Sequence, residues 1–406
     1  MTTAAISTQS RQTQHSLKSV GVSPRLLIIA GAASLGIAIG MLVVGNSASR
    51  LAHAYLLGIS FCLSISLGAL FFVVLQHLTN ARWSVTARRL AELLASPIPI
   101  LGILFVPVLL SMFAGSGALY HWNDAGVVAG DALLQHKTPF LNAPFFTVRC
   151  VIYFAAWIAM SRFFLRNSVA LDGGNEEAFR RMRHYSGPAM LLYALTVNFA
   201  AFDVLMSLDP HWFSTIYGVY FFAGCAVAFF ATLPLLVMFV QSRGVLKEAV
   251  TVEHFHDFGK LLFGFVFFWA YIAFSQYLLI WYANIPEETG WFSVRQNHGW
   301  EYVSMILLVG HFALPFAGLM SRSVRRSRSL LAGWCVFLLA VHAVDFYWLI
   351  MPSVSPETAI PSVTDLLCLL GVGLIWLGAL LRGLLKHQLL NTGDPYFETS
   401  LAFHNA

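Results

Sequence analysis

Long runs of apolar residues recur from one end of this 406-residue chain to the other. A helix needs about 20 apolar residues to cross the hydrocarbon core of a bilayer. Ten runs reach roughly this length, and short polar segments separate them. They cover residues 26–44, 51–75, 98–118, 145–164, 187–208, 212–240, 258–281, 300–320, 329–351 and 360–384. We therefore predict an all-α membrane protein with ten transmembrane helices.

Composition excludes the classes of protein that fold in water. Hydrophobic residues make up 58% of the chain and charged residues 11%, against about 25% charged in an average globular domain. The mean hydropathy is +0.71. Such a chain has too few polar side chains to cover a water-exposed surface, so we expect the lipid bilayer to be its surroundings.

The distribution of cations predicts an orientation. Of the 24 Lys and Arg residues, twenty lie in alternate loops or in the two terminal segments. The remaining four lie in the other loops or at their edges: Arg50, Lys137, Arg149 and Arg295. Because cytoplasmic loops carry the excess of cations, both termini are predicted to be cytoplasmic. The same bias explains the net charge of +5 without a nucleic-acid partner.

One membrane domain, residues 25–386, accounts for most of the chain. Residues 1–24 are polar and lack acidic side chains, which is typical of a disordered tail. We expect this tail and the C-terminal segment 387–406 to lie in the cytoplasm, and we interpret the first span as a retained helix rather than a cleaved signal peptide.

Short matching stretches suggest an internal repeat. Met-Ser-Arg ends both span 4 and span 8, and an Asp followed seven residues later by a Pro ends both span 5 and span 9. The matching residues are Met160 and Met320, Asp203 and Asp345, and Pro210 and Pro352. We therefore predict two four-helix bundles, spans 2–5 and 6–9, with spans 1 and 10 flanking them. An even number of spans per unit makes this repeat parallel.

Ionisable residues inside the spans are candidates for function. Each costs about 2.5–3.5 kcal/mol at mid-bilayer and therefore tends to face the protein interior. We select a set that could form a proton path from a cytoplasmic mouth, through the middle, to the outer half: His256, Asp257 and Lys260; then His311, Tyr271 and Ser275; then Asp203, His342 and Asp345. The alternative is that these groups are satisfied hydrogen-bonding partners that hold helices together.

The cysteines give no sign of a redox centre. All five lie in or beside apolar segments, and none forms a Cys-x-x-Cys pair, so signatures of iron–sulfur, zinc and c-type haem sites are missing. His311 and His342 lie on neighbouring spans, but nothing else marks a haem pocket. We expect no catalytic residue, no metal and no redox cofactor in this chain.

Several stretches resemble the NrfD/PsrC-type membrane proteins, and within them the ActF-type subunits of alternative complex III. The most specific are Asp209-Pro210-His211-Trp212 and Ile285-Pro286-Glu287-Glu288-Thr289. Further matching stretches are Gln76-His77-Leu78-Thr79, Ala81-Arg82-Trp83-Ser84, Leu141-Asn142 with Arg149, Ser275-Gln276-Tyr277 and His311-Phe312-Ala313-Leu314-Pro315.

The resemblance implies a function that the residues alone do not. It implies a subunit of a respiratory quinol:cytochrome c (or similar acceptor) oxidoreductase in the bacterial inner membrane. Iron–sulfur clusters and haems are then expected in partner subunits, namely an iron–sulfur subunit and a multihaem cytochrome, beside an ActC-type quinol subunit and in some complexes a terminal oxidase. The ActF-type subunit is assigned a proton-conducting and assembly role.

Three alternatives remain open at this point. The chain could bind and oxidise quinol itself, or serve as a purely structural anchor. It could also be an ion-coupled transporter, although the repeat is parallel and the Gly/Pro-broken helices that mark many transporter sites are missing from the sequence pattern.

Overall fold

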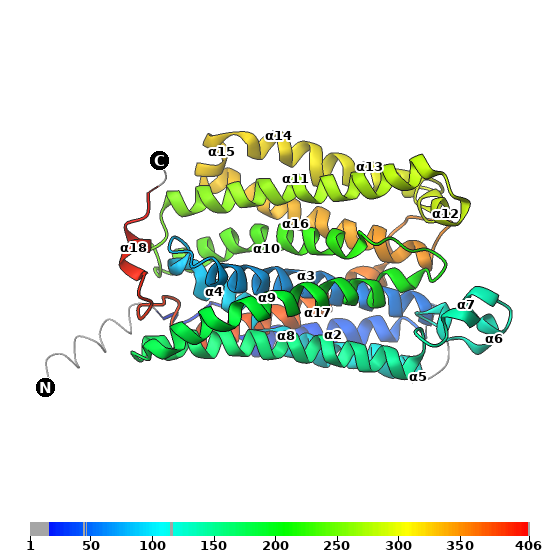
Figure 1. The fold of residues 1–406 in the computed structure, drawn as a ribbon, viewed down its shortest axis with the longest axis horizontal. Coiled ribbons are helices and arrows are strands. Elements are labelled where there is room, and N and C mark those ends of the chain that lie inside the picture. Colours follow the sequence, from blue (N-terminus) through cyan, green and yellow to red (C-terminus); the bar gives the residue numbers. More distant parts are fainter. Residues whose placement is uncertain (1–15, 44, 46, 114–116, 405–406) are drawn as a thin grey trace, which may run out of the picture.

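The computed structural model describes residues 16–43, 45, 47–113 and 117–404, which form helices and no strands (Figure 1). Within these residues, nine helices are long and apolar enough to cross a membrane. They are α3 (Ala48–Leu78), α4 continued by α5 (Val85–Ala95, Ile98–Phe113), α8 (Ala143–Asp172), α9 (Glu176–Val204), α10 (Tyr217–Ser242), α11 (Val252–Ala283), α13 to α14 (Trp300–Ile306, Leu314–Met320), α16 (Arg328–Ile350) and α17 (Val363–Lys386). The all-helical prediction is confirmed, and the fold is compatible with a multi-pass membrane protein.

The first predicted span is a shorter helix than expected. It corresponds to α2 (Pro24–Gly40), an apolar helix of 17 residues and therefore about 26 Å long. It packs against α17, where a Cβ atom on Gly31 would lie 2.5 Å from the carbonyl oxygen of Gly371. Glycine is thus required for this close approach of two helices, as in many membrane proteins.

The third span begins earlier than the sequence predicted. We expected a basic loop before residue 98, but α4 occupies this segment and every one of its residues is buried. Its two arginines form ion pairs, Arg88 with Asp394 at 3.1 Å and Arg89 with Asp172 at 3.0 Å. The acids that neutralise Arg88 and Arg89 in these pairs are distant in the sequence. The sequence alone therefore indicated a charged loop in water rather than a buried helix.

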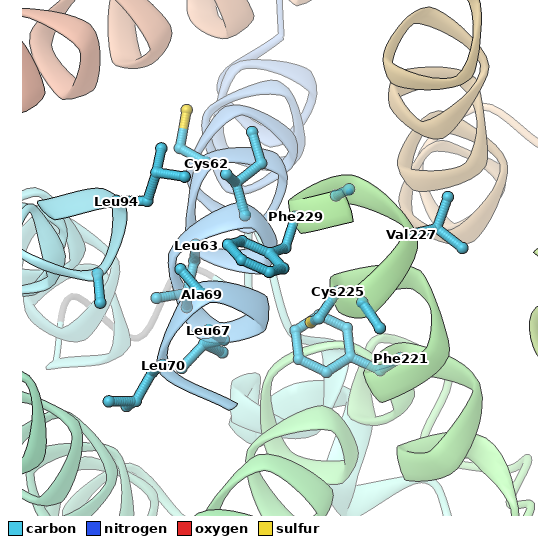
Figure 2. Packing of buried hydrophobic residues seen from close by; sticks show 14 of the residues in the cluster. Cys62, Leu63, Leu67, Ala69, Leu70, Leu94, Phe221, Cys225, Val227 and Phe229 are labelled. Carbon is cyan, nitrogen blue, oxygen red and sulfur yellow. The ribbon is translucent and has the colours of Figure 1, made fainter. Parts of the chain in front are cut away.

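Helices α3 and α10 form the centre of the molecule. Helix α3 packs against α4, α5, α8 and α9, whereas α10 packs against α11, α16 and α9. The two central helices touch at Gly68, where a Cβ atom would lie 2.1 Å from the carbonyl oxygen of Cys225. Figure 2 shows this interface, with Cys225 and Phe229 of α10 close to α3.

Short elements cover the two ends of the long helices. At one end, which we call the basic end, lie α15 (Arg322–Arg326) and α18 (Phe397–Leu401) (Figure 1). At the opposite end, which we call the α12 end, lie α6 (Ala125–Ala129), α7 (Ala132–Lys137) and α12 (Pro286–Val294). Single turns complete the chain: η1 (His121–Asn123), η2 (Met206–Leu208) and η4 (Met351–Ser353).

The two terminal segments are described in part. Residues 1–15 of the predicted N-terminal tail lie outside the described residues, as do 405 and 406. Within the part of the predicted tail that the structure describes, Leu17 and Val20 are buried, and the guanidinium of Arg243 donates a hydrogen bond to the carbonyl of Val20. In the C-terminal segment, Leu389 and Asp394 are buried.

Candidate functional site

Three helices bring buried polar side chains together around Asp345 of α16. The hydroxyl of Tyr220 on α10 donates a short hydrogen bond to Oδ1 of Asp345. One turn earlier, Nδ1 of His342 lies 3.9 Å from the other carboxylate oxygen, as expected for residues three apart on a helix. Nε2 of His342 is 3.0 Å from the hydroxyl of Ser64 on α3. The carboxylate and imidazole are therefore each held from a different helix.

His311 enters the same cluster from a π-helical segment, η3 (Leu307–Ala313), between α13 and α14. Its ring is fully buried, and its centroid lies 3.9 Å from the ring centroid of Trp269 and 5.9 Å from that of His342. Pro315 explains the local irregularity, because a proline has no N–H to donate to the carbonyl four residues earlier, which is that of His311. Such π segments are frequent at functional sites.

The cluster contains unsatisfied nitrogen atoms. In the described part of the chain, neither ring nitrogen of His311 has a hydrogen-bond partner, and neither does Nδ1 of His342. Side-chain ligand atoms of His311, His342 and Asp345 all lie within 4.8 Å of one another. We call these three residues the His–His–Asp cluster. Buried polar atoms normally have partners, so the unpaired nitrogens make this group a candidate to bind a proton, a water molecule or an ion.

A cavity of about 630 Å³ lies beside the His–His–Asp cluster, between α11 and the helix formed by α13 and η3. Tyr220 and Trp269 belong both to its wall and to the cluster's surroundings. Its rim carries Tyr271, Phe274 and Met305, which are exposed on the outer surface of the helices. The cavity therefore opens sideways, toward the region where lipid chains would lie.

The α12 end of the cavity holds a buried cation, Arg295. Its guanidinium donates hydrogen bonds to the backbone carbonyls of Trp291, Trp348 and Leu349 and lies 3.4 Å over the Trp291 ring. Burial lowers the pKa of Arg295 to about 9, so it remains a cation at neutral pH. Because carbonyls near the end of α16 lack partners within the helix, this arginine fastens that end.

Asp203, the second predicted aspartate, lies in a different environment. Its two oxygens accept hydrogen bonds of 2.8 Å each from Nε and Nη2 of Arg149, and Tyr153 donates a third at 2.6 Å. The Arg149 guanidinium lies over the ring of Phe140 at 3.9 Å. This arrangement links α8 to α9, and it is separate from the His–His–Asp cluster.

The predicted mouth of the path lies at the basic end of α11. Asp257 and Lys260 form an ion pair within one helical turn, and His256 is buried beside them. Trp269 is the residue of α11 that contacts the His–His–Asp cluster, and it lies about 20 Å further along the helix at 1.5 Å per residue. His256 and Trp269 are thus separated by 13 of the 32 residues of α11, too far for direct contact between the mouth and the cluster.

Of the three middle residues proposed from the sequence, Tyr271 and Ser275 lie outside the cluster. Tyr271 is exposed on the rim of the cavity, and Ser275 is partly buried, one turn beyond it. The structure therefore brings together three of the nine predicted residues, namely His311, His342 and Asp345.

Sequence reasoning missed the residues that complete the cluster. Ser64 and Tyr220 lie in long apolar runs where a single hydroxyl carries no pattern, and Trp269 is one of 11 tryptophans. It also missed the buried Glu92, which pairs with Arg89 at 3.1 Å. The helix around Glu92 could have been predicted from the sequence, because an Arg and a Glu three residues apart favour a helix over a loop.

The Asp-Pro-His-Trp stretch of the family resemblance packs against α12, the helix that begins within the Ile-Pro-Glu-Glu-Thr stretch. Trp212 of the Asp-Pro-His-Trp stretch stacks on Trp291 of α12, with ring centroids 4.3 Å apart. Helix α12 begins at Pro286, inside the Ile-Pro-Glu-Glu-Thr stretch. Lys137 adds a hydrogen bond of 2.5 Å to the carbonyl of Pro210. These contacts join the loop after α9, α7 and α12 at the α12 end of the molecule.

Comparison with known proteins adds no relative. No protein-family model matches the chain. A search of curated proteins found no significant match.

Proposed function

We propose that this chain is a membrane subunit of a quinol:electron-acceptor oxidoreductase of the alternative complex III type, and that the buried polar core around Asp345 transfers protons. The observation that supports a proton-transfer role is the contact of His342, Asp345 and Tyr220 deep inside the protein. The family assignment rests on the sequence stretches that resemble ActF-type subunits.

Proton transfer would use the groups that the helices hold in place. Asp345 and His342 can exchange a proton across 3.9 Å through a small side-chain movement or one water molecule. Tyr220 holds one carboxylate oxygen and leaves the other toward the imidazole. His311 offers the next nitrogen, and the adjacent cavity offers a route by which water reaches this point.

The proposal includes ten membrane crossings, with α2 as the first and both termini in the cytoplasm. It also includes two four-helix bundles that meet at α3 and α10. The packing of α3 with α4, α5, α8 and α9, and of α10 with α11 and α16, supports this arrangement. In this orientation the basic end would face the cytoplasm and the α12 end would face the periplasm.

The proposed partners carry the redox groups. We propose an iron–sulfur subunit, a multihaem cytochrome and an ActC-like quinol subunit as neighbours. Purification of the tagged chain from its native membrane, followed by mass spectrometry and absorption spectroscopy of the co-purified material, tests this proposal. Stoichiometric haem and iron in partner subunits are expected. Purification of the chain with none of these partners would contradict it.

Quinol binding by this chain itself is a second candidate, and the cavity between α11 and α13 favours it. A ring-sized head group could enter from the lipid side past Tyr271 and Met305 and reach Tyr220, as expected for a cofactor site with apolar walls and few polar groups. A photoreactive quinone analogue should then label cavity residues, and excess quinone should suppress the labelling. Labelling confined to other subunits would contradict this candidate.

A further inference from the structure

The His–His–Asp cluster has the chemistry of a metal site as well as that of a proton site. Two imidazoles and one carboxylate are a ligand set that suits Zn²⁺ and related ions, since imidazole binds these metals well. All three side chains are buried, at 0–2% exposure. Their ligand atoms lie within 4.8 Å of one another.

The unpaired nitrogen atoms point to a ligand independently of this proximity. His311 is completely buried, and in the described residues neither of its ring nitrogens has a partner. Nδ1 of His342, which faces Asp345, is likewise unpaired. A buried donor or acceptor without a partner costs about 1–3 kcal/mol, and an ion bound to these nitrogens would remove that cost.

The surrounding residues resemble the outer shell of a metal site. Metal-binding histidines commonly use their second nitrogen for a hydrogen bond that fixes the ring. Here Ser64 occupies Nε2 of His342 and leaves Nδ1 toward Asp345. Tyr220 in the same way occupies one oxygen of Asp345 and leaves the other. The unpaired Nδ1 of His342 and the second oxygen of Asp345 thus lie 3.9 Å apart.

The cluster also has space for small adjustments. Zinc bonds of about 2.0–2.2 Å would hold the ligand atoms closer than they lie here, so the side chains must move inward by roughly an ångström. Gly224 leaves room for this, because a Cβ atom there would come within 3.1 Å of Cε1 of His342. The adjacent cavity reaches Tyr220 and Trp269, which border the cluster, and provides an approach.

We propose that His311, His342 and Asp345 form a binding site for a divalent transition-metal ion of the zinc class. This inference differs from our sequence-based expectation of no metal, because His311 comes from a different helix than His342 and Asp345 and the sequence does not show that these helices meet. It does not depend on the proposed respiratory function. A bound ion would occupy the groups that we propose for proton transfer, so zinc should inhibit that transfer.

Metal content of the purified protein tests the proposal. The full chain, with any subunits that accompany it, is stripped with a chelator, incubated with Zn²⁺, desalted and assayed for zinc per chain. We expect the wild-type protein to retain one more zinc ion per chain than the His311→Gln and Asp345→Asn variants. The His256→Gln variant should retain the wild-type amount. His256 is a suitable control because it is also a buried histidine but lies at the basic end of α11.

Two further measurements distinguish loss of the metal site from misfolding of these variants. Tyr220→Phe changes the volume little and should weaken zinc binding about 10–100-fold, as expected for a group that orients a ligand. X-ray absorption at the zinc edge of the wild-type protein should show two nitrogen ligands and an oxygen ligand at about 2.0–2.2 Å. Failure of the wild-type protein to retain zinc, a first shell containing sulfur or only oxygen, or equal retention by all variants would overturn the proposal.

Discussion

The two buried aspartates differ in how completely their oxygens are occupied. Asp203 accepts two hydrogen bonds from Arg149 and one from Tyr153, so a proton on its carboxyl group would break a bidentate ion pair. Asp345 accepts a hydrogen bond from Tyr220 and faces an imidazole rather than a guanidinium. A carboxylate beside a titratable partner can exchange protons, whereas one bound by an arginine mainly holds helices together. We therefore interpret Asp203 as structural and Asp345 as functional.

The first prediction follows from the Arg149–Asp203 pair. Asp203→Asn leaves the buried guanidinium without its counter-charge, and breaking such a pair typically costs about 3–5 kcal/mol. We expect a lower midpoint of thermal unfolding in detergent, followed by fluorescence or size-exclusion chromatography. Glu287→Gln is the control, because Glu287 is exposed on α12. An Asp203→Asn protein as stable as the Glu287→Gln protein would contradict the structural interpretation.

Among the elements, the contact between α3 and α10 depends on a residue without a side chain. Gly68 lets the backbones approach so closely that a Cβ atom would overlap the Cys225 carbonyl, at 2.1 Å. Such a clash is with backbone and cannot be relieved by turning a side chain. The position of α10, and with it that of Tyr220 in the His–His–Asp cluster, is therefore linked to a glycine on a neighbouring helix.

The second prediction tests this contact. Gly68→Ala should destabilise the protein by about 1–3 kcal/mol, the usual cost of overpacking. The matched control is Gly264→Ala on α11, where a Cβ atom would have open space within 4 Å. Helix propensity favours alanine at both sites, so the difference in unfolding midpoint between the two variants isolates the clash. Equal midpoints would show that α3 and α10 do not depend on this approach.

At the scale of the whole molecule, hydropathy predicted most of the fold. Nine predicted spans are long apolar helices among the described residues, because burial in a bilayer requires about 20 apolar residues in each. The first span, α2, is shorter, and α4 was missed because its arginines pair with distant acids. Helix ends and buried ion pairs depend on residues that are distant in the sequence. The hydropathy of a single apolar run does not predict these residues.

The candidate site was predicted less completely than the fold. His342 and Asp345 could be paired from their spacing on one helix, and the structure places His311 beside them. The sequence could not separate Asp203 from this group, since its partner Arg149 lies more than 50 residues away. Ser64 and Tyr220 also come from distant helices. Contacts between helices therefore decided which polar residues belong together.

The third prediction concerns the orientation of the whole chain. A membrane-impermeant thiol reagent applied from outside should label Val127→Cys on α6 and spare Ser323→Cys on α15. The five native cysteines are buried and should give little background. Both chosen positions are exposed. Labelling of Ser323→Cys with protection of Val127→Cys would reverse the orientation.

The fourth prediction concerns redox groups. The chain purified apart from its partners should show no haem absorption and no stoichiometric iron, because its cysteines do not cluster in the sequence. Optical spectroscopy and iron analysis check this outcome. A stoichiometric b-type haem spectrum would contradict it and would make His311 and His342 the first candidates for axial ligands. Zinc at the His–His–Asp cluster would change neither the haem absorption nor the iron content.

The central claim is that Asp345 transfers protons, and proton release in liposomes tests it most directly. Asp345→Asn preserves the shape of the side chain and can still accept the hydrogen bond from Tyr220, but it cannot exchange a proton. The proposed complex containing this variant should assemble and oxidise quinol, yet release fewer protons per electron than complexes carrying Glu287→Gln. An Asp345→Asn complex that assembles and releases as many protons per electron as the control would contradict the account.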